Sequence, residues 1–176
     1  MNTFIRTIDE LESLDTSDIR NLYHSLSKEE HMELFAINYV VNSDNFLSLL
    51  HIIMSYPSSK VLFVTDGFSS VQGVFGYCNK DGIGYPFMLL SEECISTNRL
   101  RLCREAKKFL NSIVAKELLV TIIEQNTVAY EWLIRILGFK EHSKQGSKLT
   151  LRREVPENVR TGNTSCYISS STGLCN

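Results

Sequence analysis

Acidic side chains and a histidine gather in one short stretch of the sequence, at Glu29, Glu30, His31 and Glu33. A carboxylate or an imidazole beside a substrate amine can remove its proton, so Glu33 and His31 are the candidates for a general base. A structural role accounts for the same residues more simply. Ser27 and Glu30 have the spacing of a helix capping box, and acidic residues are favoured at the start of a helix by its dipole. We therefore expect a helix to begin here.

The sequence does not predict a metal site. The five cysteines form no CxxC pair, and the four histidines show no HExxH pattern or other ligand spacing. Ser96 and Thr97 could act as nucleophiles, but no base lies near them in the sequence. We expect them to cap a helix instead.

A basic stretch lies further along the chain and comprises Arg99, Arg101, Arg104, Lys107 and Lys108. These side chains could bind the phosphates of a coenzyme, or they could form a solvated helix face, as charge runs usually do. We do not expect nucleic acid as a partner, because the net charge is −2. If an anion binds, Arg99 and Arg101 are the residues expected to contact it, since they lie nearest the expected helix start.

Hydrophobic periodicity predicts the elements that position these residues. We expect strands at 3–8, 61–64, 71–77, 85–90 and 118–123, and a final hairpin at 140–144 and 149–155. We expect helices at 16–26, from 28, at 46–56, at 99–116 behind a Ser96–Asn98 cap, and from Asn126 to Gly138. The passage from Tyr85 to Ile123 predicts a right-handed parallel crossover. The expected fold class is α/β, with a mixed, mostly antiparallel sheet and helices on both faces.

The length of 176 residues predicts one domain, over 1–155. Residues 156–176 are rich in Ser, Thr, Asn and Gly, and we expect them to form a flexible tail. The first residues do not resemble a signal peptide, and no apolar run approaches the roughly 20 residues of a membrane span. We therefore expect a cytoplasmic protein without a membrane span.

The segment NTVAYEWLIRILGFKEH resembles the GNAT acyltransferase superfamily, whose members follow a strand with a helix that opens Asn-x-x-Ala and ends Gly-Phe. Asn126, Ala129, Gly138 and Phe139 match this pattern, and the element order matches over about residues 3–155. The resemblance implies a GNAT-like fold. It also implies acetyl-CoA as the coenzyme if the protein is active, with Asn126 beside Arg99 and Arg101 in the coenzyme site.

Two departures from the superfamily pattern argue against activity. Its acetyl-CoA users place a glycine-rich turn between the central strand and the long helix, where backbone amides surround the pyrophosphate. This sequence has no glycine between Gly84 and Gly138, and it has Glu92 and Glu93 at the expected place. Many members also use a helical Tyr as general acid. The equivalent position here is Leu133 or Ile134, depending on the direction of counting, because this helix is one residue longer.

The chain resembles one branch more closely, the acetyltransferase-like internal virion proteins of short-tailed bacteriophages. The segments SLSKEEHMELFAIN, GVFGYC and FMLLSEEC carry that resemblance. Our leading hypothesis is therefore a catalytically degenerate GNAT-fold phage protein without a cofactor, which contacts virion or host proteins in the host cytoplasm or in the virion. One alternative is an active N-acetyltransferase that moves acetyl from acetyl-CoA to an amine. A second is a small phage protein that inhibits a host enzyme.

Overall fold

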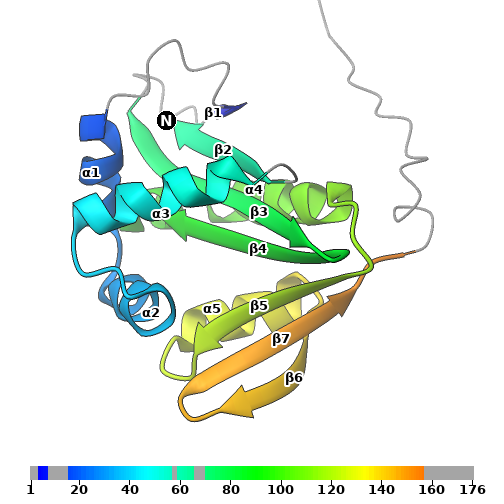
Figure 1. The fold of residues 1–176 in the computed structure, drawn as a ribbon. Coiled ribbons are helices and arrows are strands. Elements are labelled where there is room, and N and C mark those ends of the chain that lie inside the picture. Colours follow the sequence, from blue (N-terminus) through cyan, green and yellow to red (C-terminus); the bar gives the residue numbers. More distant parts are fainter. Residues whose placement is uncertain (1–3, 8–15, 57–58, 66–69, 157–176) are drawn as a thin grey trace, which may run out of the picture.

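A computed structural model describes residues 4–7, 16–56, 59–65 and 70–156 of the chain. Seven strands form one sheet in the order β1-β2-β3-β4-β5-β7-β6 (Figure 1). The strands are β1 (Phe4–Thr7), β2 (Lys60–Thr65), β3 (Val71–Lys80), β4 (Ile83–Leu90), β5 (Glu117–Ile123), β6 (Lys140–Gln145) and β7 (Lys148–Glu154). Only β4 and β5 pair in parallel, and every other neighbouring pair is antiparallel. The mixed, mostly antiparallel sheet and the parallel crossover are confirmed.

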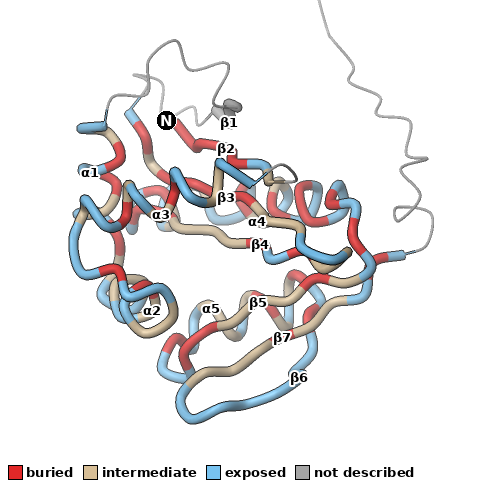
Figure 2. Tube along the Cα trace, in the orientation of Figure 1, coloured by how far each residue is buried: buried red, intermediate tan, exposed pale blue. Residues whose placement is uncertain are grey.

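Helices pack on both faces of the sheet. They are α1 (Thr16–Ser25), α2 (Lys28–Asn38), α3 (Ser43–Ser55), α4 (Glu92–Ser112), α5 (Thr127–Glu131) and a π-helical stretch, η2 (Trp132–Ile136). Because successive side chains of a strand point to opposite faces, β2 contributes to two cores. Val61 and Phe63 join the core under α1 and α3, and Leu62 and Val64 join the core under α4 and η2. The buried segments of β2 and β3 lie between these layers (Figure 2).

The hairpin between β3 and β4 is tighter than the sequence predicted. Strand β3 continues to Lys80 rather than ending at Tyr77, and Asp81 and Gly82 alone form the turn. Both turn residues have positive φ, 55° and 79°. This is the backbone that a two-residue hairpin turn requires and that Asp-Gly favours.

Helix α4 begins earlier than expected. Its N-cap is Ser91, whose hydroxyl accepts a hydrogen bond from the Cys94 amide at 3.1 Å. Ser96 lies inside the helix, where its hydroxyl donates to the Glu93 carbonyl at 2.9 Å, so the expected Ser96–Asn98 cap is wrong. Asn98 leaves helical geometry (φ −123°, ψ 16°) and kinks the helix. The earlier start follows from Cys94, whose buried side chain anchors this first turn in the core.

The helix after β5 begins at the expected cap and accommodates one additional residue. The Asn126 side chain accepts from the Ala129 amide at 3.1 Å, and Gly138 ends the helix with a φ of 76°. Between them, the Leu137 amide donates to the Trp132 carbonyl, five residues earlier, at 3.1 Å. Such a π turn holds one residue more than an α turn. It explains why this helix is longer than the superfamily pattern.

Some expectations lie outside the described residues, namely both ends of the expected 3–8 strand and nearly all of the 156–176 tail. Within the described ranges, no helix combines the length and apolar character of a membrane span. The same ranges contain no cluster of three or more side chains suited to holding a metal ion.

Candidate functional site

Strands β4 and β5 diverge soon after they meet. Both lie wholly within the described residues, and they pair only at Ile83 with Glu117 and at Gly84 with Leu118. Beyond this point, residues 85–90 of β4 and 119–123 of β5 follow separate directions, and we call this arrangement the fork (Figure 1). Helix α2 lies at its open end.

Pro86 explains why the pairing of β4 and β5 stops. The Leu90 amide donates to the Glu30 side chain of α2, so it faces the fork. Alternate residues of a strand direct their amides to the same edge. Met88 and Pro86 therefore present their nitrogens to the fork as well. Proline has no N–H, so it is tolerated in this central strand only at an edge without a strand partner. Of these two residues, only Met88 therefore has an N–H that can donate into the fork.

Glu33 of α2 contacts the far arm of the fork, which is formed by β5. Its carboxylate accepts a hydrogen bond from the side-chain amide of Asn126, which is only 5% exposed and lies just past the end of β5. The pKa of Glu33 is raised from 4.5 to about 7, chiefly by burial and to a smaller extent by the nearby Glu30 carboxylate. The Asn126 hydrogen bond acts in the opposite direction. A carboxyl group with this pKa exchanges protons near neutral pH.

Glu30 forms the expected capping box and also contacts the near arm of the fork, which is formed by β4. Its Oε2 accepts from the Ser27 amide at 3.0 Å, and the Glu30 amide donates to the Ser27 hydroxyl at 3.2 Å. Its Oε1 accepts from the Leu90 amide, at the end of β4, at 3.2 Å. Leu26 and Ser91 also form an antiparallel bridge. The start of α2 is therefore attached to the end of β4.

His31 is held against α1 instead. Its Nε2 lies 2.8 Å from the Tyr23 carbonyl oxygen, and its ring packs edge-on against the Tyr23 ring with centroids 4.7 Å apart. The structure thus brings Glu33, but not His31, into hydrogen-bond contact with Asn126.

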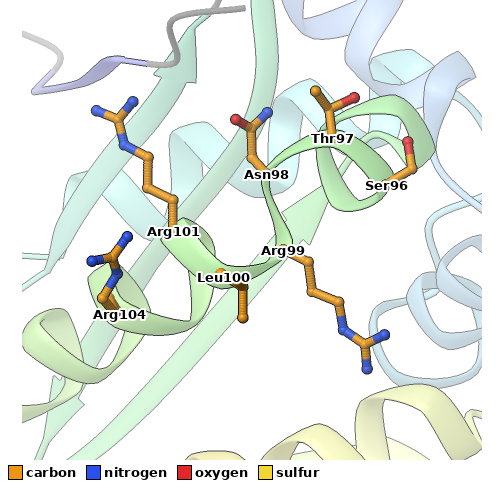
Figure 3. A pocket seen from close by; sticks show the side chains of 7 residues that line it. All are labelled: Ser96, Thr97, Asn98, Arg99, Leu100, Arg101 and Arg104. Carbon is orange, nitrogen blue, oxygen red and sulfur yellow. The ribbon is translucent and has the colours of Figure 1, made fainter.

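The basic stretch surrounds the kink in α4. A depression there is lined by Ser96, Thr97, Asn98, Arg99, Leu100, Arg101 and Arg104. Arg101 and Arg104 extend on one side of the helix, while Arg99 extends on the other (Figure 3). Among the described residues no carboxylate forms an ion pair with any of the three arginines, whereas Lys108 on the same helix pairs with Glu105. The three guanidinium groups remain available to an anion.

Comparison with known proteins establishes the fold. No family model matches the sequence, and no curated protein matches it. Among solved structures, the chain is similar to PaiA N-acetyltransferase from Thermoplasma acidophilum in complex with coenzyme A. That match has a TM-score of 0.62 and 17% identity, and it covers 88% of this chain and 99% of that one. Structures described as GNAT-family acetyltransferases match the same share of the chain, so the fold is that of the GNAT acetyltransferases.

Two other N-acetyltransferase structures give the same result at lower TM-scores. One is Campylobacter jejuni N-acetyltransferase PseH in complex with acetyl coenzyme A (TM-score 0.56, 12% identity, covering 87% of this chain and 99% of that one). The other is spermidine N-acetyltransferase from Vibrio cholerae in complex with CoA and spermine (TM-score 0.57, 13% identity, covering 85% and 92%). At these identities the similarity concerns the fold.

The turn into α4 differs from the GNAT phosphate turn in the way the sequence indicated. Residues 92–97 form a helical turn, and Glu92 and Glu93 are exposed in it. The Ser91 hydroxyl accepts a hydrogen bond from the Cys94 amide, so this amide is not available to a phosphate. The same hydroxyl donates to the Gln72 side chain at 2.9 Å. Carboxylates at this position repel a pyrophosphate. The three arginines lie about one turn further along the helix.

The position of the GNAT general acid holds apolar side chains. Leu133 is buried, and Ile134 packs against the same core. Tyr130, on α5, donates its hydroxyl hydrogen to Glu141 Oε1 at 2.6 Å, and this bond raises the pKa of Tyr130. The Tyr130 hydroxyl is therefore hydrogen bonded to a side chain of β6.

Sequence reasoning missed four features of this region. The second bond of Glu30, to Leu90, and the bond from Asn126 to Glu33 join residues 60 and 93 positions apart, and no local pattern encodes such contacts. Arg104 was noted as basic but not singled out as an anion contact. Pro86 did carry a signal, because a proline within a strand indicates an edge without a strand partner.

Proposed function

We propose that this protein is a GNAT-type N-acyltransferase that moves an acetyl group from acetyl-CoA to an amine. The observation that supports it best is Glu33, a largely buried carboxyl group with a pKa of about 7 at the open end of the fork. This placement of a near-neutral acid is typical of a general base.

Glu33 removes a proton from the acceptor amine. A primary amine with a pKa near that of lysine, about 10.4, is protonated at neutral pH and cannot attack a carbonyl carbon until it loses a proton. Glu33 in its ionised form accepts that proton, and Asn126 holds the carboxylate in place by its hydrogen bond. When bound, acetyl-CoA would supply an acyl thioester: the amine nitrogen bonds to its carbonyl carbon, the carbon–sulfur bond breaks, and the departing thiolate takes the second proton of the amine nitrogen.

The near arm of the fork supplies the electrophilic assistance. The Met88 N–H is directed into the fork and is suited to stabilise negative charge on the thioester oxygen, as backbone amides do in oxyanion holes. On α4, Arg99 and Arg101, with Arg104, are suited to hold the coenzyme phosphates through their guanidinium groups. In this proposal side chains replace the backbone amides of the missing glycine turn.

The test is acetyl transfer from acetyl-CoA to a panel of primary amines, measured as released thiol. We expect turnover by the wild-type protein and a loss of at least about a hundredfold in Glu33→Gln, the usual contribution of a positioned base. Glu29→Gln is the matched control, since Glu29 is exposed on the same helix. No turnover with any amine, or equal turnover by Glu33→Gln, would contradict the proposal.

A second candidate is a catalytically silent GNAT-fold protein that acts through protein contacts, as our leading hypothesis from the sequence has it. It is favoured by the helical, glycine-free turn with Glu92 and Glu93. Exposed apolar side chains on and beside α2 also favour it, with Phe35 56% and Tyr39 77% exposed. Assignment to a phage virion, or to inhibition of a host enzyme, remains a prediction. A rise in melting temperature with acetyl-CoA would oppose the silent candidate. Absence of the chain from purified particles would oppose the virion assignment.

A further inference from the structure

Helix α2 is hydrogen bonded to both arms of the fork. Glu30 accepts from the Leu90 amide at the end of β4, and Glu33, three residues later, accepts from Asn126 just past the end of β5. Residues at this spacing lie on the same face of a helix. The strands do not pair with each other here, so these two carboxylates form a link between the two arms.

The two oxygens of Glu30 have separate roles. Capping of α2 uses Oε2, which accepts from the Ser27 amide and hydroxyl. The Leu90 bond uses Oε1. The capping role that the sequence predicted therefore accounts for two of the three hydrogen bonds that this partly buried carboxylate accepts.

On the far arm the Asn126 amide is committed at both ends. Its Oδ1 accepts from the Ala129 amide at 3.1 Å and its Nδ2 donates to Glu33. Asn126 is buried, so its rotation would leave buried polar groups without hydrogen-bond partners, which is unfavourable. Displacement of Glu33 is thereby coupled to the first turn of α5.

We propose that α2 is a clasp across the open end of the fork and that Glu30 is a positioning residue, which holds Glu33 in place by anchoring α2 to β4. The inference rests on the proposed role of Glu33 as a base. Glu33 has Asn126 and the Glu30 carboxylate as its polar neighbours, and Glu30 has Ser27, the Leu90 amide and the charge of His31.

The test uses Glu30→Gln and reads its effect on the opposite arm. Glutamine has a single acceptor oxygen, so it can serve the Ser27 amide or the Leu90 amide but not both. We expect hydrogen exchange of the Ala129 amide to become about tenfold faster, because loosening α2 frees Asn126. We also expect kcat to fall about tenfold while the KM for acetyl-CoA changes less than about twofold, since α2 does not form the arginine depression.

Two controls separate the clasp from capping and from charge. Ser27→Ala removes the capping hydroxyl but keeps both bonds from Glu30 to backbone amides, so it should lower stability without changing exchange at Ala129. Glu29→Gln removes a charge from the same turn and should change neither the stability nor the exchange of the Ala129 amide. If Glu30→Gln does not fold, Asn126→Ala provides the reciprocal measurement, in which exchange of the Leu90 amide should accelerate.

The outcomes distinguish the clasp from the proposed activity. Exchange needs no turnover, so faster exchange at Ala129 in a protein that acetylates nothing supports the clasp and rejects the proposed function. Turnover that depends on Glu33, with unchanged exchange and kcat in Glu30→Gln, overturns the clasp and keeps the function. An equal effect of Ser27→Ala on Ala129 also overturns the clasp, because it would reduce Glu30 to a helix cap.

Discussion

Replacing Glu33 with Gln should make the protein more stable above neutral pH. Burial raises the pKa of Glu33 from 4.5 in the unfolded chain to about 7 in the fold. Between these two values the folded state binds more protons than the unfolded state, so stability falls as pH rises through this window. The difference corresponds to about 3 kcal/mol, at about 1.4 kcal/mol for each tenfold change in proton affinity. Above pH 7 the cost of the buried charge is complete.

Glutamine has nearly the same shape and still accepts from Asn126, but it carries no charge. Glu33→Gln should therefore equal the wild type near pH 4.5 and exceed it by up to about 3 kcal/mol at pH 8. That gain corresponds to a rise in melting temperature of roughly 6–12 °C for a domain of this size. Urea unfolding from pH 4.5 to 8.5 measures the difference, with Glu29→Gln as the exposed control. Parallel stability curves for the wild type and Glu33→Gln would show that Glu33 is not the buried titrating group and would refute the reasoning.

Three further predictions follow from the described contacts. Gly84→Ala should destabilise the fold by about 1–3 kcal/mol in thermal unfolding, because an added Cβ would lie 2.7 Å from a side-chain carbon of β5. Wild-type stability in the same assay would contradict this packing. Asn126→Ala should lower the free energy of unfolding by about 1 kcal/mol through loss of the helix cap. It should also reduce kcat by releasing Glu33, and an unchanged kcat would show that Asn126 does not position Glu33. Charge reversal at Arg99 or Arg101 should weaken acetyl-CoA binding at least about tenfold in calorimetry, while Lys107→Glu should not. Equal effects of all three would indicate a general charge effect rather than a site.

The sequence predicted the elements that depend on neighbouring residues. The Ser27–Glu30 capping box, the Asn126 cap and the Gly138 helix end are local, and the structure confirms each one. The β4–α4–β5 crossover also followed from short-range patterns, because an apolar strand, a helix and a second apolar strand allow few arrangements. From these features the GNAT fold could be inferred.

The site could be predicted only in part, because its decisive contacts join distant segments. Glu33 was a candidate by residue type, but its raised pKa comes from burial in the folded chain, and its hydrogen-bond partner Asn126 lies 93 residues away. The start of α4 was misplaced because Ser96 has the residue type of a helix cap, whereas the actual start at Ser91 depends on burial of Cys94 in the core. The additional helical residue could be counted in advance, but its place in a π turn at Trp132 could not.

Pro86 has a consequence for how a ligand enters. A missing backbone hydrogen is a covalent property of the chain, so Pro86 cannot donate to β5 even when nothing lies between the two strands, and their pairing does not continue past Gly84. An incoming extended molecule therefore has no inter-strand hydrogen bonds to break before it binds. Such preorganisation spares the free energy of rearrangement and favours rapid association.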